Sequence, residues 1–271
     1  MQFLRKKGIF KDVFTDKTTI GFIKVFILSI VLTLIICTPV SLICKYIGVQ
    51  FTRDMFNSLK DISMFISIIY VIKNKISEDF KYEFVKSPSI NVIILPIIVS
   101  FISEVITTFS RMIPAFYGYN VIGIGSNQAL VKYNSFTLSL FIFCGLIPAI
   151  IEETFFRFFS YIYLKKFLKF IVENRSLIFI KNISNNIYTK MFINKKFSYN
   201  LIWILIISTI FAMAHGPNIY NFYLYFIPGV IFGVFYFKYG LLSAILAHAF
   251  GNYFSPPVMD LIIYIINMFV K

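Results

Sequence analysis

Two adjacent glutamates, Glu152 and Glu153, lie in the apolar stretch IPAIIEETFFRFF together with Arg157. Glu153 and Arg157 are four residues apart, so they share a helix face and can form an ion pair that lowers the cost of burying both charges. Glu152 points about 100° away and has no such partner on its own helix. A lone carboxylate in an apolar medium holds a proton more readily, which suits a general base near neutral pH. Two neighbouring carboxylates in different surroundings are typical of acid–base sites.

The chain has two histidines, and both lie in or at the end of apolar stretches. His215 follows Phe211 by four residues in FAMAHGP, and His248 precedes Asn252 by four residues in ILAHAFGNYF. Each pair therefore shares one face of its helix. An ionisable group within a bilayer costs about 2.5–3.5 kcal/mol, so such residues indicate function by default.

Glu152, His215, His248 and Asn252 come from three separate apolar segments. Counting about 1.5 Å per residue places all four roughly 10–22 Å from the inner membrane edge, so they can meet at one depth. Other interpretations stay open at this point. The Glu–Arg pair can be a structural salt bridge, and His or Asn can join helices by hydrogen bonds. A transporter also uses intramembrane Glu, His and Asn as a proton or ion relay.

The elements that must position these residues are membrane helices. Hydrophobic residues make up 58% of the 271 residues and the mean hydropathy is +0.80, well above the roughly 45–50% apolar content of soluble domains. We predict an all-α, polytopic transmembrane bundle that forms one integral membrane domain over 1–271. About eight spans are expected, within a range of roughly six to eight, and the candidates are 20–43, 57–72, 90–109, 136–163, 199–215, 220–237, 241–254 and 256–270.

Two of these spans depend on local features of the sequence. The span 57–72 is short and follows a polar stretch, so it either crosses the membrane or lies in the interface. The last two spans are separated only by Ser255-Pro256-Pro257, where two prolines predict a break or a sharp kink. Small residues at helical spacing, Gly229 with Gly233 and Ser243 with Ala247 and Gly251, predict closely packed interior helices.

The net charge of +14 is distributed between the apolar stretches. With a cytoplasmic N-terminus and eight spans, most Lys and Arg residues lie on the cytoplasmic side, and the C-terminus is cytoplasmic as well. This distribution indicates contact with lipid headgroups and argues against a nucleic-acid partner. The most basic connection, 164–198, contains Lys165, Lys166, Lys169, Arg175, Lys181, Lys190, Lys195 and Lys196.

Together, E-E-x-x-x-R (Glu152, Glu153, Arg157), F-x-x-x-H (Phe211, His215) and H-x-x-x-N (His248, Asn252) resemble the motifs of the CPBP family. This family comprises the type II CaaX prenyl endopeptidases and the bacterial Abi-type proteases, some of them linked to bacteriocin self-immunity. The motif-bearing core covers about 136–254, and no motif position departs from the pattern.

The resemblance implies a role for each matched residue. Glu152 and His215 would activate a water for attack on a peptide carbonyl, His248 and Asn252 would stabilise the oxyanion, and Glu153 with Arg157 would support the site. An alternative view of the family is a zinc metalloprotease, with Glu152, His215 and His248 as ligands. Glu with two His is an acceptable zinc set, whereas a Glu–His dyad with two donors needs no metal.

The resemblance therefore predicts an intramembrane endopeptidase in a multi-pass protein of a bacterial plasma membrane. Its substrate would be a membrane-associated peptide or protein, in CaaX-type processing, bacteriocin or peptide maturation, or self-immunity. The alternative is a non-catalytic immunity or transport protein. Transporters often contain inverted repeats with matching polar breaks in both halves, whereas all the motifs here lie in the C-terminal half, which argues against transport.

Overall fold

The structure, a computed structural model, describes residues 17–75, 77–126, 138, 141–173 and 178–269. All regular secondary structure within these ranges is helical, in agreement with the predicted all-α class. Among the described residues, four helices are long and apolar enough to cross a membrane, and Tyr223–Tyr239 is a shorter apolar helix. The count of about eight spans and the cytoplasmic location of both termini stay predictions. The four long candidates are Ile23–Tyr46, Met55–Lys73, Asn91–Tyr117 and Phe197–Ala214.

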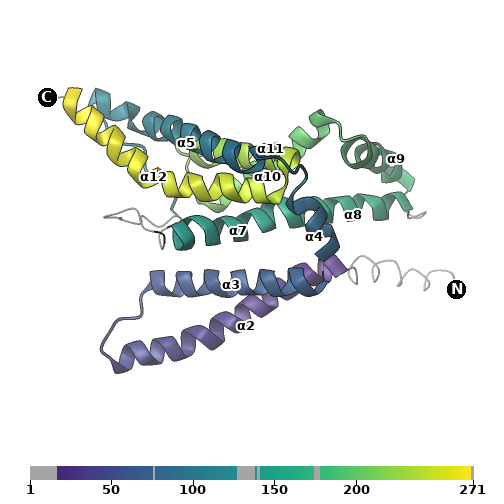
Figure 1. Ribbon diagram of the computed structural model, residues 1–271, viewed down its shortest axis with the longest axis horizontal. Helices are drawn as coiled ribbons and strands as arrows, with labels where there is room; N and C mark the ends of the chain where they lie inside the picture. The colour runs from purple at the N-terminus through teal and green to yellow at the C-terminus, as the bar shows by residue number, and fades with distance from the viewer. Residues whose placement is uncertain (1–16, 76, 127–137, 139–140, 174–177, 270–271) are drawn as a thin grey trace. The chain divides into compact units, whose positions relative to one another are not determined.

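The chain divides into two compact units, one formed by Met1–Glu83 with Phe158–Tyr199 and the other by Phe84–Arg157 with Asn200–Lys271. In the first unit, α2 (Lys17–Tyr46) and α3 (Arg53–Lys75) pack against each other, and Figure 1 shows them diverging toward the loop that joins them. The other helices of this unit are α4 (Ser77–Phe84), which ends at its border, α8 (Ser160–Glu173), α9 (Ile178–Tyr188) and the short π-helix η5 (Thr189–Ile193).

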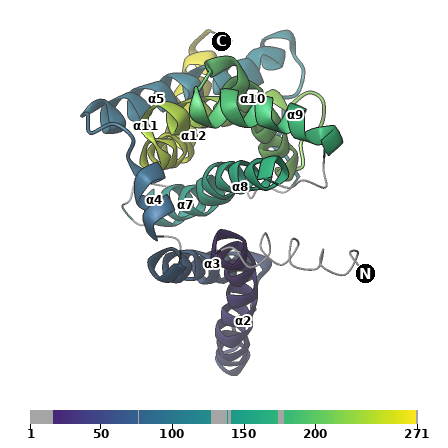
Figure 2. The same ribbon diagram turned by 90° about the vertical axis from the view of Figure 1, so that its right-hand side faces the viewer.

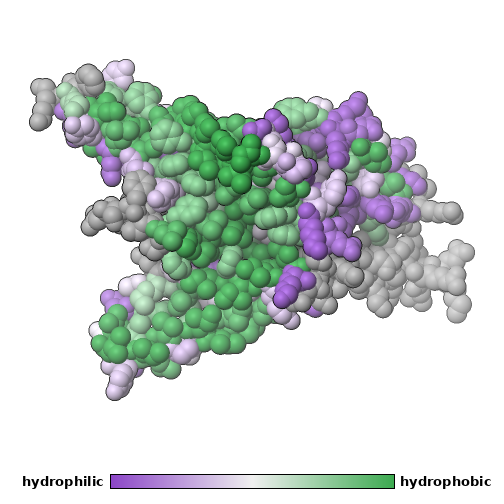
Figure 3. Space-filling view, in the orientation of Figure 1, coloured by the Kyte–Doolittle hydropathy of each residue, from purple (hydrophilic) through white to green (hydrophobic). Residues whose placement is uncertain are grey.

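The composition of α2 explains how it packs. Four of its buried positions, Val25, Ser29, Thr33 and Cys37, recur every four residues, and Cys44 is buried seven residues further on, so they form one narrow stripe. Thr33 Oγ1 donates to the Ser29 carbonyl at 2.7 Å, so the small polar groups are satisfied within the helix. The remaining surface of α2 is apolar and exposed, and it is coloured as hydrophobic in Figure 3. A helix that is hydrophobic all round is suited to lipid.

The basic connection 164–198 is more structured than the sequence suggested. The helix that begins at Ser160 continues to Glu173, and α9 and η5 cover most of the described residues that follow. Lys166 of α8 forms an ion pair with Asp79 of α4 at 3.3 Å. The segment is therefore a set of packed helices that contains many cations.

The second unit contains all the predicted site residues. Its helices are α5 (Asn91–Met112), the 3-10 helix η2 (Ile113–Tyr117), the π-helix η3 (Phe141–Leu146), α7 (Ile147–Glu153), α10 (Phe197–Ala214), α11 (Tyr223–Tyr239) and α12 (Leu241–Phe269). A further π-helix, η4 (Thr154–Phe159), begins directly after Glu153. α12 packs against α5, α11, η3 and α7, and Figure 2 shows α11 and α12 side by side. This central helix carries His248 and Asn252.

Of the two outcomes predicted at Ser255-Pro256-Pro257, a break or a sharp kink, the break does not occur, because α12 is one continuous helix from Leu241 to Phe269. Neighbouring helices in a membrane protein can compensate for the backbone groups that a proline leaves unpaired. Figure 1 shows that α12 changes direction along its length, as prolines within a helix cause. The stretches 241–254 and 256–270 therefore belong to one bent helix, as far as Phe269.

Small residues allow close helix packing in this unit, as their spacing predicted. A Cβ atom added to Gly233 of α11 would lie 2.8 Å from Ile204 Cγ2 of α10, and one added to Gly229 would lie 3.2 Å from Phe211 Cδ1. Ser100 Oγ of α5 donates to the Ala247 carbonyl of α12 at 2.6 Å. The outer side of α5 is apolar and exposed, and Figure 3 shows a hydrophobic surface along this helix. These contacts fix α10, α11 and α12 as supports of the site.

Candidate active site

The site is built around a buried ion pair. Arg157 Nε lies 3.3 Å from Glu153 Oε2, and both side chains have 0% exposure, so the predicted pair four residues apart is present. Arg157 Nη2 also donates to the Gly229 carbonyl at 3.0 Å, and its guanidinium lies 5.1 Å from the centre of the Phe211 ring. The backbone changes from α-helix to π-helix immediately after Glu153, and π-helical turns frequently occur at functional sites.

Glu153 connects this pair to His248. His248 Nδ1 lies 3.0 Å from Glu153 Oε1, and the imidazole is 5% exposed. The oxygens of a carboxylate only accept hydrogen bonds, so Nδ1 carries the proton in this contact. The hydrogen bond orients the ring and leaves Nε2 as the atom that faces the rest of the site.

His215 is oriented by its own helix end. Its Nδ1 lies 2.9 Å from the Phe211 carbonyl, one turn earlier. A carbonyl oxygen only accepts, so Nδ1 is the protonated nitrogen here as well. The spacing F-x-x-x-H thus has a geometric meaning, because it places a backbone acceptor beneath the imidazole. In the neutral ring, Nε2 of His215 then carries a lone pair.

Glu152 lies opposite both histidines. Its Oε2 is 3.8 Å from His215 Nε2 and 3.8 Å from His248 Nε2. Both separations exceed hydrogen-bonding distance, and Oε2 is buried without a hydrogen-bond partner. The side chain as a whole is 30% exposed, compared with 0% for Glu153. The two adjacent glutamates therefore have the unequal surroundings that the sequence predicted.

Aromatic rings surround the two imidazoles. Phe232 of α11 stacks on His248 with centroids 4.7 Å apart and an interplanar angle of 13°. Tyr225 of the same helix stacks on His215 at 4.6 Å and 16°. Phe211 contacts both histidines, at 4.7 Å from His215 and 5.6 Å from His248. Tyr225 and Phe232 were not expected from the sequence.

Asn252 lies one helical turn beyond His248 on α12, as predicted. Its Nδ2 donates to the Cys144 carbonyl of η3 at 3.3 Å. This bond joins two helices, and a backbone carbonyl in a π-helix is a ready acceptor for it. An amide nitrogen has two protons, so one N–H of Asn252 is committed to Cys144 and the other can serve a ligand. The structure thus groups Glu152, His215 and His248 closely and ties Asn252 to the neighbouring helix.

Glu152, His215 and His248 are also the residues that would hold a zinc ion. Their chemistry is suitable, since Glu and His ligate zinc, and the Glu153–His248 bond resembles the outer bonds of zinc ligands. Zinc bonds of about 2.0–2.2 Å would place tetrahedral ligand atoms about 3.3–3.5 Å apart, whereas both measured separations are 3.8 Å. Over the part of the chain that the structure describes, no group of three or more His, Cys, Asp or Glu side chains could hold a metal ion. Both separations are longer than those between zinc ligands, and whether the site binds a metal stays a prediction for experiment.

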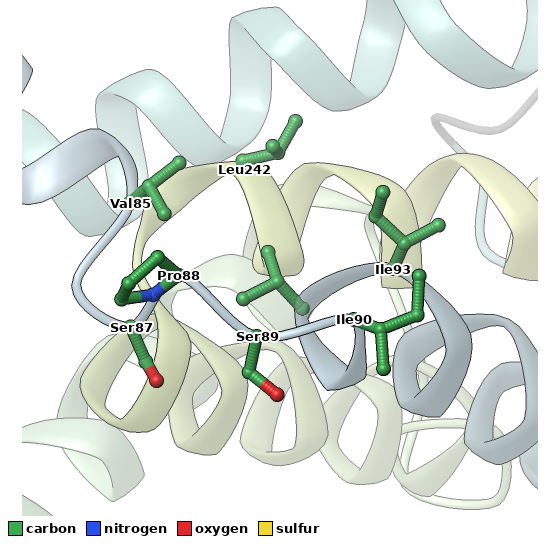
Figure 4. Close-up of a pocket in the computed structure, with 8 residues that line it drawn as sticks. Val85, Ser87, Pro88, Ser89, Ile90, Ile93 and Leu242 are labelled. Carbon is green, nitrogen blue, oxygen red and sulfur yellow. The ribbon is translucent and has the colours of Figure 1, made fainter.

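A separate surface depression lies away from these residues. It has a volume of about 310 Å³ and an almost entirely apolar wall (Figure 4). Figure 4 shows the hydroxyls of Ser87 and Ser89 pointing away from Leu242, and no residue in the wall is ionisable. This depression has no group that could perform acid–base chemistry. It is lined by Val85, Ser87, Pro88, Ser89, Ile90, Val92, Ile93 and Leu242.

Comparison with known proteins supports the resemblance based on the three motifs. Residues 134–254 match the family model described as type II CAAX prenyl endopeptidase Rce1-like. All six motif residues that carry polar groups lie within the matched region. No curated protein and no solved structure matches the chain.

Proposed function

Because residues 134–254 belong to the Rce1-like type II CAAX prenyl endopeptidases, a group of CPBP intramembrane proteases, we propose that the chain hydrolyses a peptide bond of a membrane-associated peptide by a metal-free acid–base mechanism. The observation that carries this proposal is the position of Glu152 Oε2, 3.8 Å from Nε2 of both histidines. The family is a protease family with apolar helices, so the chain is a peptide hydrolase of the membrane. The chemical steps follow from the surroundings of the three side chains.

Glu152 and His215 activate the attacking water. Separations of 3.8 Å are too long for direct hydrogen bonds, but one water at about 2.8 Å from each atom bridges them. Such a water donates one proton to Glu152 Oε2 and the other to His215 Nε2, which accepts because Nδ1 is bonded to the Phe211 carbonyl. Its lone pair is then directed at the scissile carbonyl carbon. Glu152 takes the proton as the C–O bond forms, and returns it to the amine that leaves.

His248 stabilises the charge on the carbonyl oxygen. Since Nδ1–H donates to Glu153, Nε2 can donate only in the imidazolium form. The Glu153 carboxylate, 3.0 Å from Nδ1 and paired with Arg157, is the group that would face the charge of that imidazolium. The free N–H of Asn252 is a second donor for the oxyanion. Donors aimed at a developing oxyanion in an enclosed site are worth about 2.7–4 kcal/mol each.

The substrate that we propose is a CaaX-type peptide, with a lipid-modified C-terminus that enters from the bilayer. A bacteriocin or peptide precursor would present the same carbonyl group, so processing or self-immunity can use the same chemistry. The substrate is held by the apolar environment, and the polar site acts only on the peptide bond.

A cleavage assay on purified protein tests the proposal. The wild type in lipid vesicles should cleave prenylated CaaX peptides, and Glu152→Gln should abolish cleavage because the amide cannot accept the water proton. Glu173→Gln is the matched control, since it is the same chemical change at an exposed residue, whose carboxylate forms a surface ion pair with Lys169. Full activity of Glu152→Gln on the same peptide would refute the assignment.

A further inference from the structure

The Tyr225 ring stacks on the face of the His215 imidazole. The two rings are nearly parallel, with centroids 4.6 Å apart and an interplanar angle of 16°. His215 needs such support because it follows Ala214, the last residue of α10, and precedes Gly216, whose φ is +63°. Its Nδ1 bond to the Phe211 carbonyl fixes one edge of the imidazole but leaves the tilt of the ring open.

Tyr225 is itself fixed by a backbone segment from elsewhere in the chain. Its hydroxyl accepts a hydrogen bond from the Gly125 N–H at 2.6 Å, and the side chain is 7% exposed. Gly125 lies directly against the His215 carbonyl, so that a Cβ atom there would overlap this oxygen. Tyr225 therefore contacts the imidazole of His215, and Gly125 contacts its backbone carbonyl.

The segment that contains Gly125, Ile122–Ser126, is anchored at both ends. At its start, Ile122 exchanges two hydrogen bonds with Arg111, each of 3.1 Å, through its N–H and its carbonyl. At its end, the Ser126 N–H donates to the Gly216 carbonyl at 3.0 Å. Asn221 Nδ2 also donates to the Gly123 carbonyl at 3.0 Å.

We propose that Tyr225 and the Ile122–Ser126 segment, which we call the strap, position His215 relative to Glu152, the two residues that activate the water. The strap sets the position of the Tyr225 ring and of the turn at His215, and together they aim His215 Nε2 at Glu152. Both contact His215, and we propose that they act through it. This inference rests on the proposed function for its catalytic consequence, whereas the orientation of the imidazole can be measured without any activity.

Two matched pairs of variants test this positioning role. Gly125→Ala should displace the His215 turn, while Gly123→Ala in the same segment meets no atom within 4 Å. Tyr225→Phe keeps the ring and loses the hydrogen bond to the strap. Tyr223→Phe is the control for Tyr225→Phe. Tyr223 is on the same helix as Tyr225, and the substitution removes a different hydroxyl, which accepts a hydrogen bond from Ser110 Oγ at 2.9 Å.

The first readout is the reaction of the two histidines with diethyl pyrocarbonate, measured by mass spectrometry on the full chain in vesicles. The chain has only two histidines, so His248 is an internal reference. We expect Gly125→Ala and Tyr225→Phe to change the rate at His215 at least about threefold relative to His248, and both controls to match the wild type. Equal ratios in all five proteins would overturn the inference, whatever the activity.

The second readout is the kinetics of peptide cleavage. A misplacement of about 1 Å costs on the order of 10²-fold in rate, so Gly125→Ala should lower kcat by 10- to 100-fold and Tyr225→Phe by a smaller factor, both with KM unchanged. If the histidine ratio changes and the wild type cleaves nothing, the proposed function fails and the positioning role stands. If kcat falls only in parallel with the folded fraction, and the ratio is constant, Tyr225 is merely structural and the inference is refuted.

Discussion

The two sides of the site differ in how far they are removed from solvent. On one side Glu153 and Arg157 are fully buried, and His248 is 5% exposed. On the other side Glu152 is 30% exposed and His215 is 18% exposed. The buried side is joined by direct contacts of 3.0 and 3.3 Å, and the open side is separated by gaps of 3.8 Å. The same residue types thus serve two purposes in adjacent positions.

This difference indicates that the buried residues stabilise the fold and that the partly exposed residues take part in the reaction. A charge on the buried side has all its partners within the protein, so its removal leaves another charge uncompensated. A charge on the open side is partly exposed and has no direct ionic contact within hydrogen-bonding distance, so its removal should affect the reaction more than the fold. The same Glu→Gln substitution should therefore lower stability on the buried side and lower activity on the open side.

The largest expected effect is on the buried side. Glu153→Gln leaves Arg157 without its ionic partner, and breaking a buried pair costs about 3–5 kcal/mol. We expect a strong loss of folded protein and a lower Tm, measured by size-exclusion chromatography and thermal unfolding in detergent. Glu152→Gln, the same change one residue earlier, should keep the wild-type yield and Tm. Equal yields and equal Tm values for the two variants would abolish the distinction between the sides.

Asn252 sharpens the comparison because it serves both purposes. Its bond to the Cys144 carbonyl is structural, and its second N–H is the proposed oxyanion donor. Asn252→Ala should lower kcat by about 10²–10³, the size of one lost oxyanion donor, with KM nearly unchanged because the donor acts in the transition state. It should lower stability by only about 1 kcal/mol, the net value of one hydrogen bond.

Ser100→Ala is the control for the structural part of this effect. It removes another hydrogen bond onto α12, from Ser100 Oγ to the Ala247 carbonyl, and its side chain is no oxyanion donor. The two variants should be similarly destabilised, and only Asn252→Ala should lose turnover. If Asn252→Ala lowers Tm and leaves kcat unchanged, Asn252 joins helices and has no role in the reaction.

Local contacts were predictable from the sequence, and contacts between distant segments were not. The Glu153–Arg157 pair follows from a spacing of four residues within one helix. The Glu153–His248 bond joins residues 95 positions apart, so no periodicity indicates it. Tyr225 and Phe232 gave no signal, because the chain has 17 Tyr and 34 Phe and a single aromatic residue does not stand out.

The choice between a break and a kink at Ser255-Pro256-Pro257 could not be made from the sequence for a similar reason. Proline disrupts a helix by its local chemistry, and that rule predicts an end. Whether the helix continues depends on the packing around it, and α12 is held along its length by α5. Val258 and Ile262, just after the prolines, are buried against Met112 of α5. Tertiary packing of this kind is absent from the local pattern.

The smallest expected effect concerns metal, and it tests whether the open side works without an ion. If Glu152, His215 and His248 act through protons alone, then chelation with EDTA or 1,10-phenanthroline should leave cleavage by the purified wild type unchanged. Elemental analysis should find no stoichiometric zinc in the active protein.

A bound zinc would instead shorten the two 3.8 Å separations and would be lost in His215→Ala, His248→Ala or Glu152→Gln. Loss of activity on chelation, restored by added zinc and accompanied by about one metal ion per chain in the wild type, would replace the metal-free mechanism. Tyr223→Phe is the control here, because it alters a hydroxyl that faces Ser110 and should leave both metal content and chelator response as in the wild type.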